Sequence, residues 1–183
     1  MDKREEAAKY GRLIHEKGLV IGAGGNISVR DGDFFVIKKQ GADMSDCAAG
    51  GYARIPFDKV EENKETLSTE TPLHIACYRA SREVNAILHV HSPLMIAAAE
   101  KTDRLVSTSY EFDCILKKAV PIIDYIQPGS ALLAKAVAEK VASGATAVMM
   151  RRHGSICVGK DLEEAYLRVL ALERACLTRL HTS

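Results

Sequence analysis

Residues 147–158 read AVMMRRHGSICV, and this stretch decides the fold. Two short apolar runs, residues 147–151 and 155–158, flank His153 and Gly154. Runs of this length on either side of a tight turn predict two neighbouring strands. Gly154 has no Cβ, so the backbone can turn sharply there and present His153 outward from the end of a strand.

On both sides of this stretch, helical and strand patterns follow one another. A charged segment at residues 2–17 has Ala7, Leu13 and Ile14 at helical spacing and predicts a first helix ended by Gly18. Three β-branched or aromatic runs separated by Asp-Gly and Gly-Gly turns predict an antiparallel meander. These three runs are residues 27–30, 34–38 and 52–56. Further strands are expected at residues 86–91 and 119–123. Helices are expected at residues 69–80, in a short segment that begins at Pro93, from Pro128 to about residue 144, and from Asp161 onward.

This order of elements predicts one domain, residues 1–183, of the α/β class. Because amphipathic helices must bury one face, we expect an α/β/α sandwich whose central sheet is largely antiparallel. A chain of 183 residues is long enough to bury a full hydrophobic core. Ser68 or Thr69 is expected to cap the helix that ends near residue 80, with Glu70 in its first turn.

Composition narrows the classes of partner. The 25 Lys and Arg residues balance 24 Asp and Glu residues and are mixed along the chain, which predicts no nucleic-acid partner. The charged start resembles no signal peptide, and no apolar run reaches the length of a membrane span, so a cytoplasmic protein is expected. Five scattered cysteines without a CxxC pair are expected to be reduced, mostly buried thiols.

Three histidines carry the pattern of a metal site. In ILHVHS, His89 and His91 lie two residues apart on a predicted strand, so their side chains project from the same face. With His153 they make three imidazoles, and three imidazoles with an open position are typical of a catalytic zinc site. The alternative from spacing alone is that the two strand histidines are polar residues satisfied within a sheet.

A carboxylate and a glycine-rich run lie elsewhere in the sequence. Glu70 follows two hydroxyl residues at a predicted helix start, where it either favours the helix dipole or moves a proton beside a metal-bound carbonyl. The run IGAGGNISVR lets backbone amides approach a ligand near Asn26, although a plain glycine-rich hairpin explains it as well. Neither a dinucleotide fingerprint nor a Walker A motif is present.

Taken in this order, GGNISVR, STE, HVH and RRHG resemble the class II fuculose-phosphate aldolase, ribulose-phosphate 4-epimerase and adducin-head family. The resemblance covers nearly the whole chain. It implies a homotetramer with active sites between subunits, in which one zinc ion per subunit is bound by His89, His91 and His153 and Glu70 is the acid/base. It also implies a phosphate pocket formed by the residues Gly25, Asn26, Gly41, Ser68 and Thr69.

The resemblance also implies a reaction, the cleavage of a ketose 1-phosphate to dihydroxyacetone phosphate and an aldehyde. Tyr110, in STSYEF, corresponds to a tyrosine that lies before a strand and protonates the aldehyde oxygen from a neighbouring subunit; a buried core tyrosine is the alternative. One departure concerns the substrate, because KKQG at residues 38–41 stands where the family has a Thr-Pro-Ser/Thr-Gly turn. A 4-epimerase, a dehydratase or a metal-free adducin-like binding module are the other functions of this scaffold.

Overall fold

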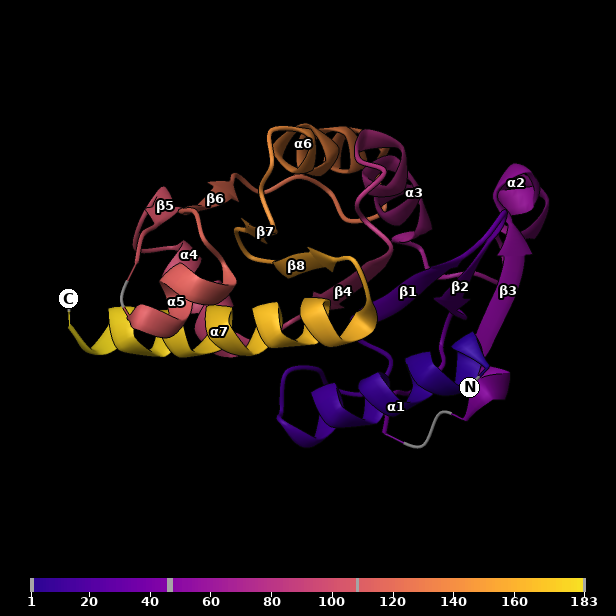
Figure 1. Cartoon of the computed structure of the whole chain (residues 1–183), viewed down its shortest axis with the longest axis horizontal. Helices are drawn as coiled ribbons and strands as arrows, with labels where there is room; N and C mark the ends of the chain where they lie inside the picture. Colours follow the sequence, from indigo (N-terminus) through magenta and orange to yellow (C-terminus); the bar gives the residue numbers. More distant parts are fainter. Residues whose placement is uncertain (1, 46–47, 108, 183) are drawn as a thin grey trace.

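The computed structural model describes residues 2–45, 48–107 and 109–182. Its centre is an eight-stranded sheet with the strand order β3-β2-β1-β4-β8-β7-β6-β5 among the described residues (Figure 1). Neighbouring strands are antiparallel except for β6 and β7, which confirms the predicted largely antiparallel sheet. The strands are β1 (Asn26–Asp31), β2 (Phe34–Lys38), β3 (Tyr52–Pro56), β4 (Ala86–Val90), β5 (Arg104–Leu105), β6 (Val120–Ile123), β7 (Ala147–Met150) and β8 (Gly154–Gly159).

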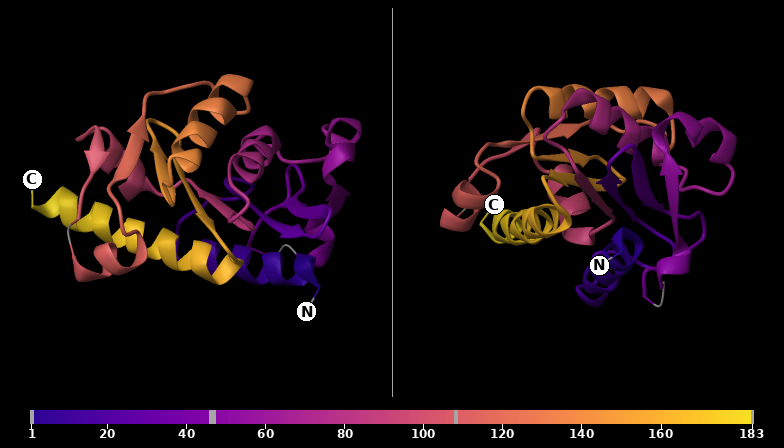
Figure 2. Two further views of the ribbon diagram at one scale, coloured as in Figure 1. Left: turned by 45° about the horizontal axis from the view of Figure 1, so that its top comes forward. Right: turned by 45° about the vertical axis from the view of Figure 1, so that its right-hand side comes forward.

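Helices cover both faces of the sheet, as expected for an α/β/α sandwich (Figures 1 and 2). On one face lie α1 (Lys3–Glu16), α4 (Pro93–Ala99), α5 (Tyr110–Ile115) and α7 (Leu162–His181). On the other face α3 (Thr71–Ala80) and α6 (Ala131–Ala142) lie side by side, and α2 (Val60–Asn63) packs near the β3 edge. Short 3-10 helices span Ala49–Gly51 and Phe57–Lys59.

Each face of the sheet has its own apolar core, because strand side chains alternate between the two faces. Val29, Leu88 and Cys157 pack toward α1, α4 and α7. Ile87 and Ile156 pack toward α3 and α6. The predicted burial of thiols holds for the cysteines Cys77, Cys157 and Cys176 but not for Cys114, which is exposed, and Cys47 lies outside the described residues.

The strand register brings distant segments to one end of the sheet. Asn26, the first residue of β1, is opposite His89 of β4, and Val90 is opposite Ser155 of β8. The start of β1, the end of β4 and the start of β8 therefore meet. The predicted meander and the turn around His153 are both confirmed by this topology.

Two predicted helix starts were wrong. Helix α3 begins at Thr71, so Glu70 is its N-cap residue and not part of its first turn. Ser68 does not cap the helix itself; its hydroxyl accepts from the Glu70 amide at 3.3 Å and its carbonyl from the Thr71 amide. Helix α6 begins three residues after Pro128, because Gly129 has a φ of +74° and Ser130 provides the cap.

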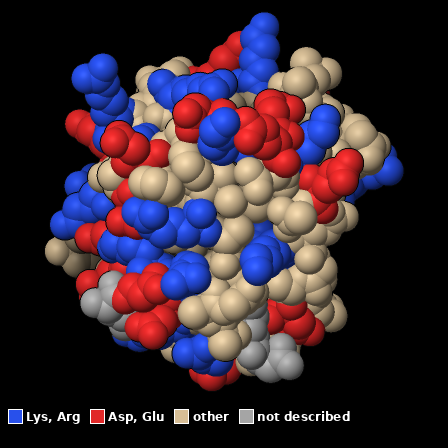
Figure 3. Space-filling model, turned by 90° about the vertical axis from the view of Figure 1, so that its right-hand side faces the viewer, with Lys and Arg blue, Asp and Glu red and all other residues tan. Residues whose placement is uncertain are grey.

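The surface is mixed in charge. Among the described residues on the face shown in Figure 3, basic and acidic side chains are interspersed with uncharged ones. Within the described ranges no helix combines the length and the apolar composition needed to cross a lipid bilayer.

A buried polar network lies between α3 and the sheet. The Ser28 hydroxyl is 2.7 Å from His74 Nδ1 and 2.7 Å from the Tyr78 hydroxyl. His74 is fully buried, and burial lowers its pKa to about 3. The imidazole is therefore neutral in the folded protein at neutral pH.

His74 should make the stability of the metal-free protein depend on pH. An unfolded histidine has a pKa of about 6.5, so the unfolded state binds the proton first and stability falls as the pH drops below that value toward 3. Relative to His74→Asn, the wild type should lose about 2 kcal/mol of unfolding free energy between pH 7.5 and 5. Urea unfolding at the two pH values measures this, and a constant difference between the two proteins would contradict it.

Candidate metal centre and anion site

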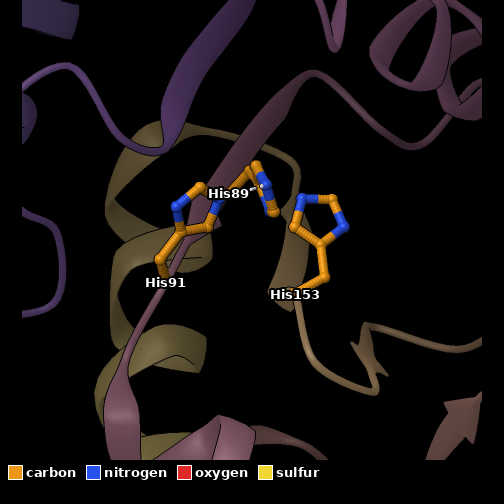
Figure 4. A group of neighbouring side chains, drawn as sticks. All are labelled: His89, His91 and His153. Carbon is orange, nitrogen blue, oxygen red and sulfur yellow. Dashed lines mark hydrogen bonds between the residues drawn. The ribbon is translucent and has the colours of Figure 1, made fainter. Parts of the chain in front are cut away.

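His89, His91 and His153 converge at the end of the sheet where β1, β4 and β8 meet (Figure 4). One ring nitrogen from each lies within 4.8 Å of the other two. The Nε2 atoms of His89 and His91 are 2.9 Å apart. The two come from the end of β4 and its continuation, and His153 comes from the turn before β8. The structure thus assembles the three predicted imidazoles.

The surroundings keep these imidazoles neutral, which is the form that binds a metal. Burial lowers the pKa of all three rings, to about 4 for His153, and for His89 the other two histidines contribute as well. His89 Nδ1 donates to the Ser155 carbonyl at 3.0 Å, so its lone pair is on Nε2, which faces His91. A ligand imidazole oriented through its other nitrogen is common in metal sites. The donor set therefore fits a bound divalent metal ion.

Glu70 lies beside this cluster and is 5% exposed. Its Oε1 accepts a hydrogen bond from the Gly129 amide, while its Oε2 is buried without a protein partner. Burial raises the pKa of Glu70, and the Gly129 hydrogen bond opposes that rise. The carboxylate is thus fixed at one oxygen and available at the other. Gly129 was not identified from the sequence as part of the site.

A cavity of about 220 Å³ connects these groups. Its walls include most of the residues predicted for phosphate binding and catalysis, and Pro128, which had not been predicted. The lining residues from those predictions are Gly25, Asn26, Ser68, Thr69, Glu70, His91 and His153. Asn26 is 3% exposed, and its Oδ1 is buried without a protein partner. Unsatisfied buried polar atoms on a cavity wall are the groups that a polar ligand would satisfy.

Three predicted site residues do not line this cavity: the fully buried His89, Gly41 and Tyr110. Gly41 follows β2 with a φ of +73° and does not line it. Tyr110 was predicted to lie before a strand, but it begins helix α5, where the Ser109 hydroxyl caps the helix. Its side chain is 81% exposed, so the alternative of a buried core tyrosine is wrong.

The glycine-rich run passes directly over the end of β4. Gly25 has a φ of +63°, and a Cβ there would lie 2.6 Å from both the His89 carbonyl oxygen and Val20 Cγ1. A Cβ on Gly24 would lie 3.2 Å from His91 Nδ1. The absence of side chains thus allows the loop to contact the histidine strand.

Gly25→Ala should destabilise the protein by at least about 2 kcal/mol, because the left-handed backbone alone costs roughly 1–2 kcal/mol for a residue with a Cβ and the clash adds to it. Gly32→Ala is the matched control, since Gly32 has a φ of +62° but nothing within 4 Å of its added Cβ. Urea unfolding of both variants separates backbone strain from the clash. Equal losses would show that contact with the histidine strand is unimportant.

Lys38 is also beside the site. It is 2% exposed at the end of β2, and its charge contributes, after burial, to lowering the pKa of His91. In the sequence, Lys38 is recognised only as the first residue of KKQG, which replaces the family's Thr-Pro-Ser/Thr-Gly turn. Its ammonium group donates to the carbonyl of Ala42, four residues away, and to that of Ala23, 15 residues away.

The chain is similar to known proteins over nearly its whole length. Residues 5–180 match the family model of the class II aldolase and adducin N-terminal domain. An L-fuculose phosphate aldolase of Methanocaldococcus jannaschii is 32% identical and covers 99% of this chain and 97% of its own. A 3-oxo-tetronate 4-phosphate decarboxylase of Cupriavidus necator is 26% identical, over 93% of this chain and 80% of its own.

The fold also matches solved structures. The L-fuculose-1-phosphate aldolase of Thermus thermophilus superposes with a TM-score of 0.89 at 26% identity, covering 100% of this chain and 95% of that one. The family match spans nearly the entire chain, and the site lies within it. The chain belongs to the class II aldolase and adducin N-terminal domain family.

Proposed function

We propose that this protein is a zinc-dependent aldolase that cleaves a ketose 1-phosphate, similar to fuculose 1-phosphate, into dihydroxyacetone phosphate and an aldehyde. The observation that carries the proposal is a cluster of three neutral imidazoles, two of which, His91 and His153, line one cavity together with a buried glutamate and an unsatisfied polar group of Asn26. Class II aldolases depend on a metal ion. Three histidines with room for substrate are typical of catalytic zinc, and they argue against a metal-free adducin-like module.

Each group has a role in that reaction. A divalent ion held by His89, His91 and His153 would polarise the substrate carbonyl and stabilise the negative charge of the enediolate left by carbon–carbon cleavage. Glu70 delivers a proton to the enediolate carbon from its unpartnered oxygen, because Gly129 holds the other oxygen. The phosphate accepts hydrogen bonds from the side-chain NH2 group of Asn26, from backbone amides near Gly25 and from the Ser68–Thr69 segment. Gly41 does not line the cavity and is left out of this pocket.

The proposal includes a cytoplasmic homotetramer in which Tyr110 acts on the site of a neighbouring subunit. Tyr110 is exposed and does not line its own cavity, which is compatible with a contribution to another subunit. In the reverse reaction, aldol condensation, Tyr110 would protonate the aldehyde oxygen. In cleavage, Tyr110 would take that proton from the substrate hydroxyl group that becomes the aldehyde. Light scattering of the purified protein tests the assembly; a fully active monomer would exclude this role for Tyr110.

A second candidate is decarboxylation of a 3-oxo sugar acid phosphate, favoured by the similarity to 3-oxo-tetronate 4-phosphate decarboxylases. Loss of carbon dioxide from that acid leaves the same enediolate of dihydroxyacetone phosphate, so the same residues serve both reactions. The 4-epimerase and dehydratase alternatives also use a metal and a proton-transfer residue but yield no dihydroxyacetone phosphate from the substrate.

The test is a product assay on the zinc-loaded protein. Fuculose 1-phosphate, ribulose 1-phosphate, ribulose 5-phosphate and 3-oxo-tetronate 4-phosphate are incubated separately, and dihydroxyacetone phosphate, aldehyde and carbon dioxide are measured. We expect dihydroxyacetone phosphate and an aldehyde in equal amounts from a ketose 1-phosphate. Carbon dioxide with dihydroxyacetone phosphate would establish the decarboxylase instead, and an epimerised or dehydrated product would refute both.

A further inference from the structure

Lys38 connects three segments that surround the proposed anion site. Its Nζ donates to the Ala23 carbonyl at 2.8 Å and to the Ala42 carbonyl at 2.7 Å. Its own backbone carbonyl accepts from the Ser68 amide at 3.2 Å. The three segments are the glycine loop at residues 22–25, the turn at residues 39–42 and the Ser68–Thr69 segment.

Two of these segments line the cavity directly. Ala23 and the glycines after it form one wall, and Ser68 and Thr69 form another. Since the loop lies against the histidine strand through Gly24 and Gly25, a shift of the loop would alter both the anion-binding amides and their distance from the metal ligands. Lys38 is therefore placed to fix the spacing of these walls.

The burial of an ammonium group needs a reason. Transfer of a charged group from water to the protein interior is unfavourable unless strong hydrogen bonds compensate it, whereas an apolar side chain of similar length would fill the same space without that cost. Two carbonyls from loops 19 residues apart in sequence accept from this one ammonium. An apolar side chain cannot join them.

We propose that Lys38 is a positioning residue for the anion site: its ammonium group ties the glycine loop to the 39–42 turn, and so holds the loop amides and Asn26 where they bind the phosphate of the substrate. The inference rests on the proposed function, because it assumes that the anion site receives a phosphate. Lys38 acts through the loop and not by contact with the substrate.

Lys38→Met tests this, because methionine keeps most of the length and apolar volume but cannot donate to the carbonyls. The neighbouring Lys39→Met is the matched control, since Lys39 is exposed. Calorimetry of the zinc-loaded proteins gives the affinity for dihydroxyacetone phosphate and for dihydroxyacetone, and hydrogen exchange reports on residues 20–26. Lys38→Met should weaken dihydroxyacetone phosphate binding at least tenfold and speed hydrogen exchange in the glycine loop. Its dihydroxyacetone binding and zinc content should stay unchanged. Lys39→Met should change none of these four properties.

The possible outcomes separate the two levels of the argument. If the wild type binds both ligands equally well, the phosphate site itself is refuted, and the role of Lys38 with it. If the wild type prefers the phosphate and Lys38→Met binds dihydroxyacetone phosphate as tightly as the wild type does, Lys38 does not position the site. Weaker phosphate binding without faster loop exchange would also overturn positioning, because Lys38 would then act by its charge. If Lys38→Met does not fold, Lys38→Gln replaces it in the test, because glutamine keeps one donor group. Lys38→Gln should show an intermediate loss of affinity for dihydroxyacetone phosphate. An unchanged affinity would overturn the proposal.

Discussion

His153→Ala is expected to weaken zinc binding by at least about a hundredfold and to abolish turnover, because the site retains only two of its three ligands. This position gives the clearest test of the metal centre. His153 lies on a turn and is partly exposed, whereas His89 is fully buried within the sheet. Removing His153 therefore changes the metal site without leaving a cavity in the core.

Metal analysis after dialysis measures this effect, with about one zinc per chain expected for the wild type. His181→Ala is the control, because His181 is an exposed histidine at the end of α7 and should affect neither zinc content nor turnover. The unfolding temperatures of both metal-free variants should stay close to that of the wild type. A metal-free preparation with full activity would refute a catalytic metal.

The histidine cluster could be predicted because the placement of each histidine is local, although their meeting depends on the pairing of β4 with β8. Side-chain alternation on a strand is enough to place His89 and His91 on one face, and Gly154 signals the turn that presents His153. The strand runs were predictable for the same reason. Apolar alternation and turn residues locate β1, β2 and β3. Both β2 and β3 start and end at the predicted residues.

The features that escaped prediction depend on contacts between distant segments. Pro128 is a favourable first residue of a helix, but the chain keeps Gly129 outside α6, where its amide holds Glu70 from 59 residues away. The burial of Lys38 likewise involves a segment 15 residues away, because the Ala23 carbonyl accepts from its ammonium group. Helix α5, which carries Tyr110, is only six residues long and has no apolar period that a sequence pattern could reveal.

Substrate choice is a different limit. Aldol cleavage, decarboxylation and their relatives begin or end with the same enediolate, so the metal ligands and Glu70 are common to all of them. What distinguishes the substrates is the wall of the cavity that receives the rest of the sugar. In the proposed assembly that wall includes residues of a neighbouring subunit, which no single-chain pattern specifies.

Glu70→Gln should leave zinc bound while slowing turnover by roughly a hundredfold or more, in line with general acid/base contributions. Glutamine preserves the shape of the side chain and an oxygen for the Gly129 amide, but it removes the group that carries the proton. The stability effect distinguishes this role from that of a helix-dipole carboxylate. Burial raises the pKa of Glu70, so ionisation costs more in the folded than in the unfolded protein, and stability at neutral pH should not fall when the charge is removed.

A carboxylate that served only the helix dipole would behave in the opposite way, losing about 0.3–1 kcal/mol of stability on substitution and keeping its turnover. Glu173→Gln is the matched control: burial also raises the pKa of Glu173, but this glutamate is only partly buried, accepts from Ser92 at 2.5 Å and does not line the cavity. Zinc content, unfolding temperature and turnover are measured on both variants. Slow turnover in Glu70→Gln alone, with zinc content and stability retained, assigns proton transfer to Glu70. Equally slow turnover in both variants would instead assign the loss of activity to the altered buried charge.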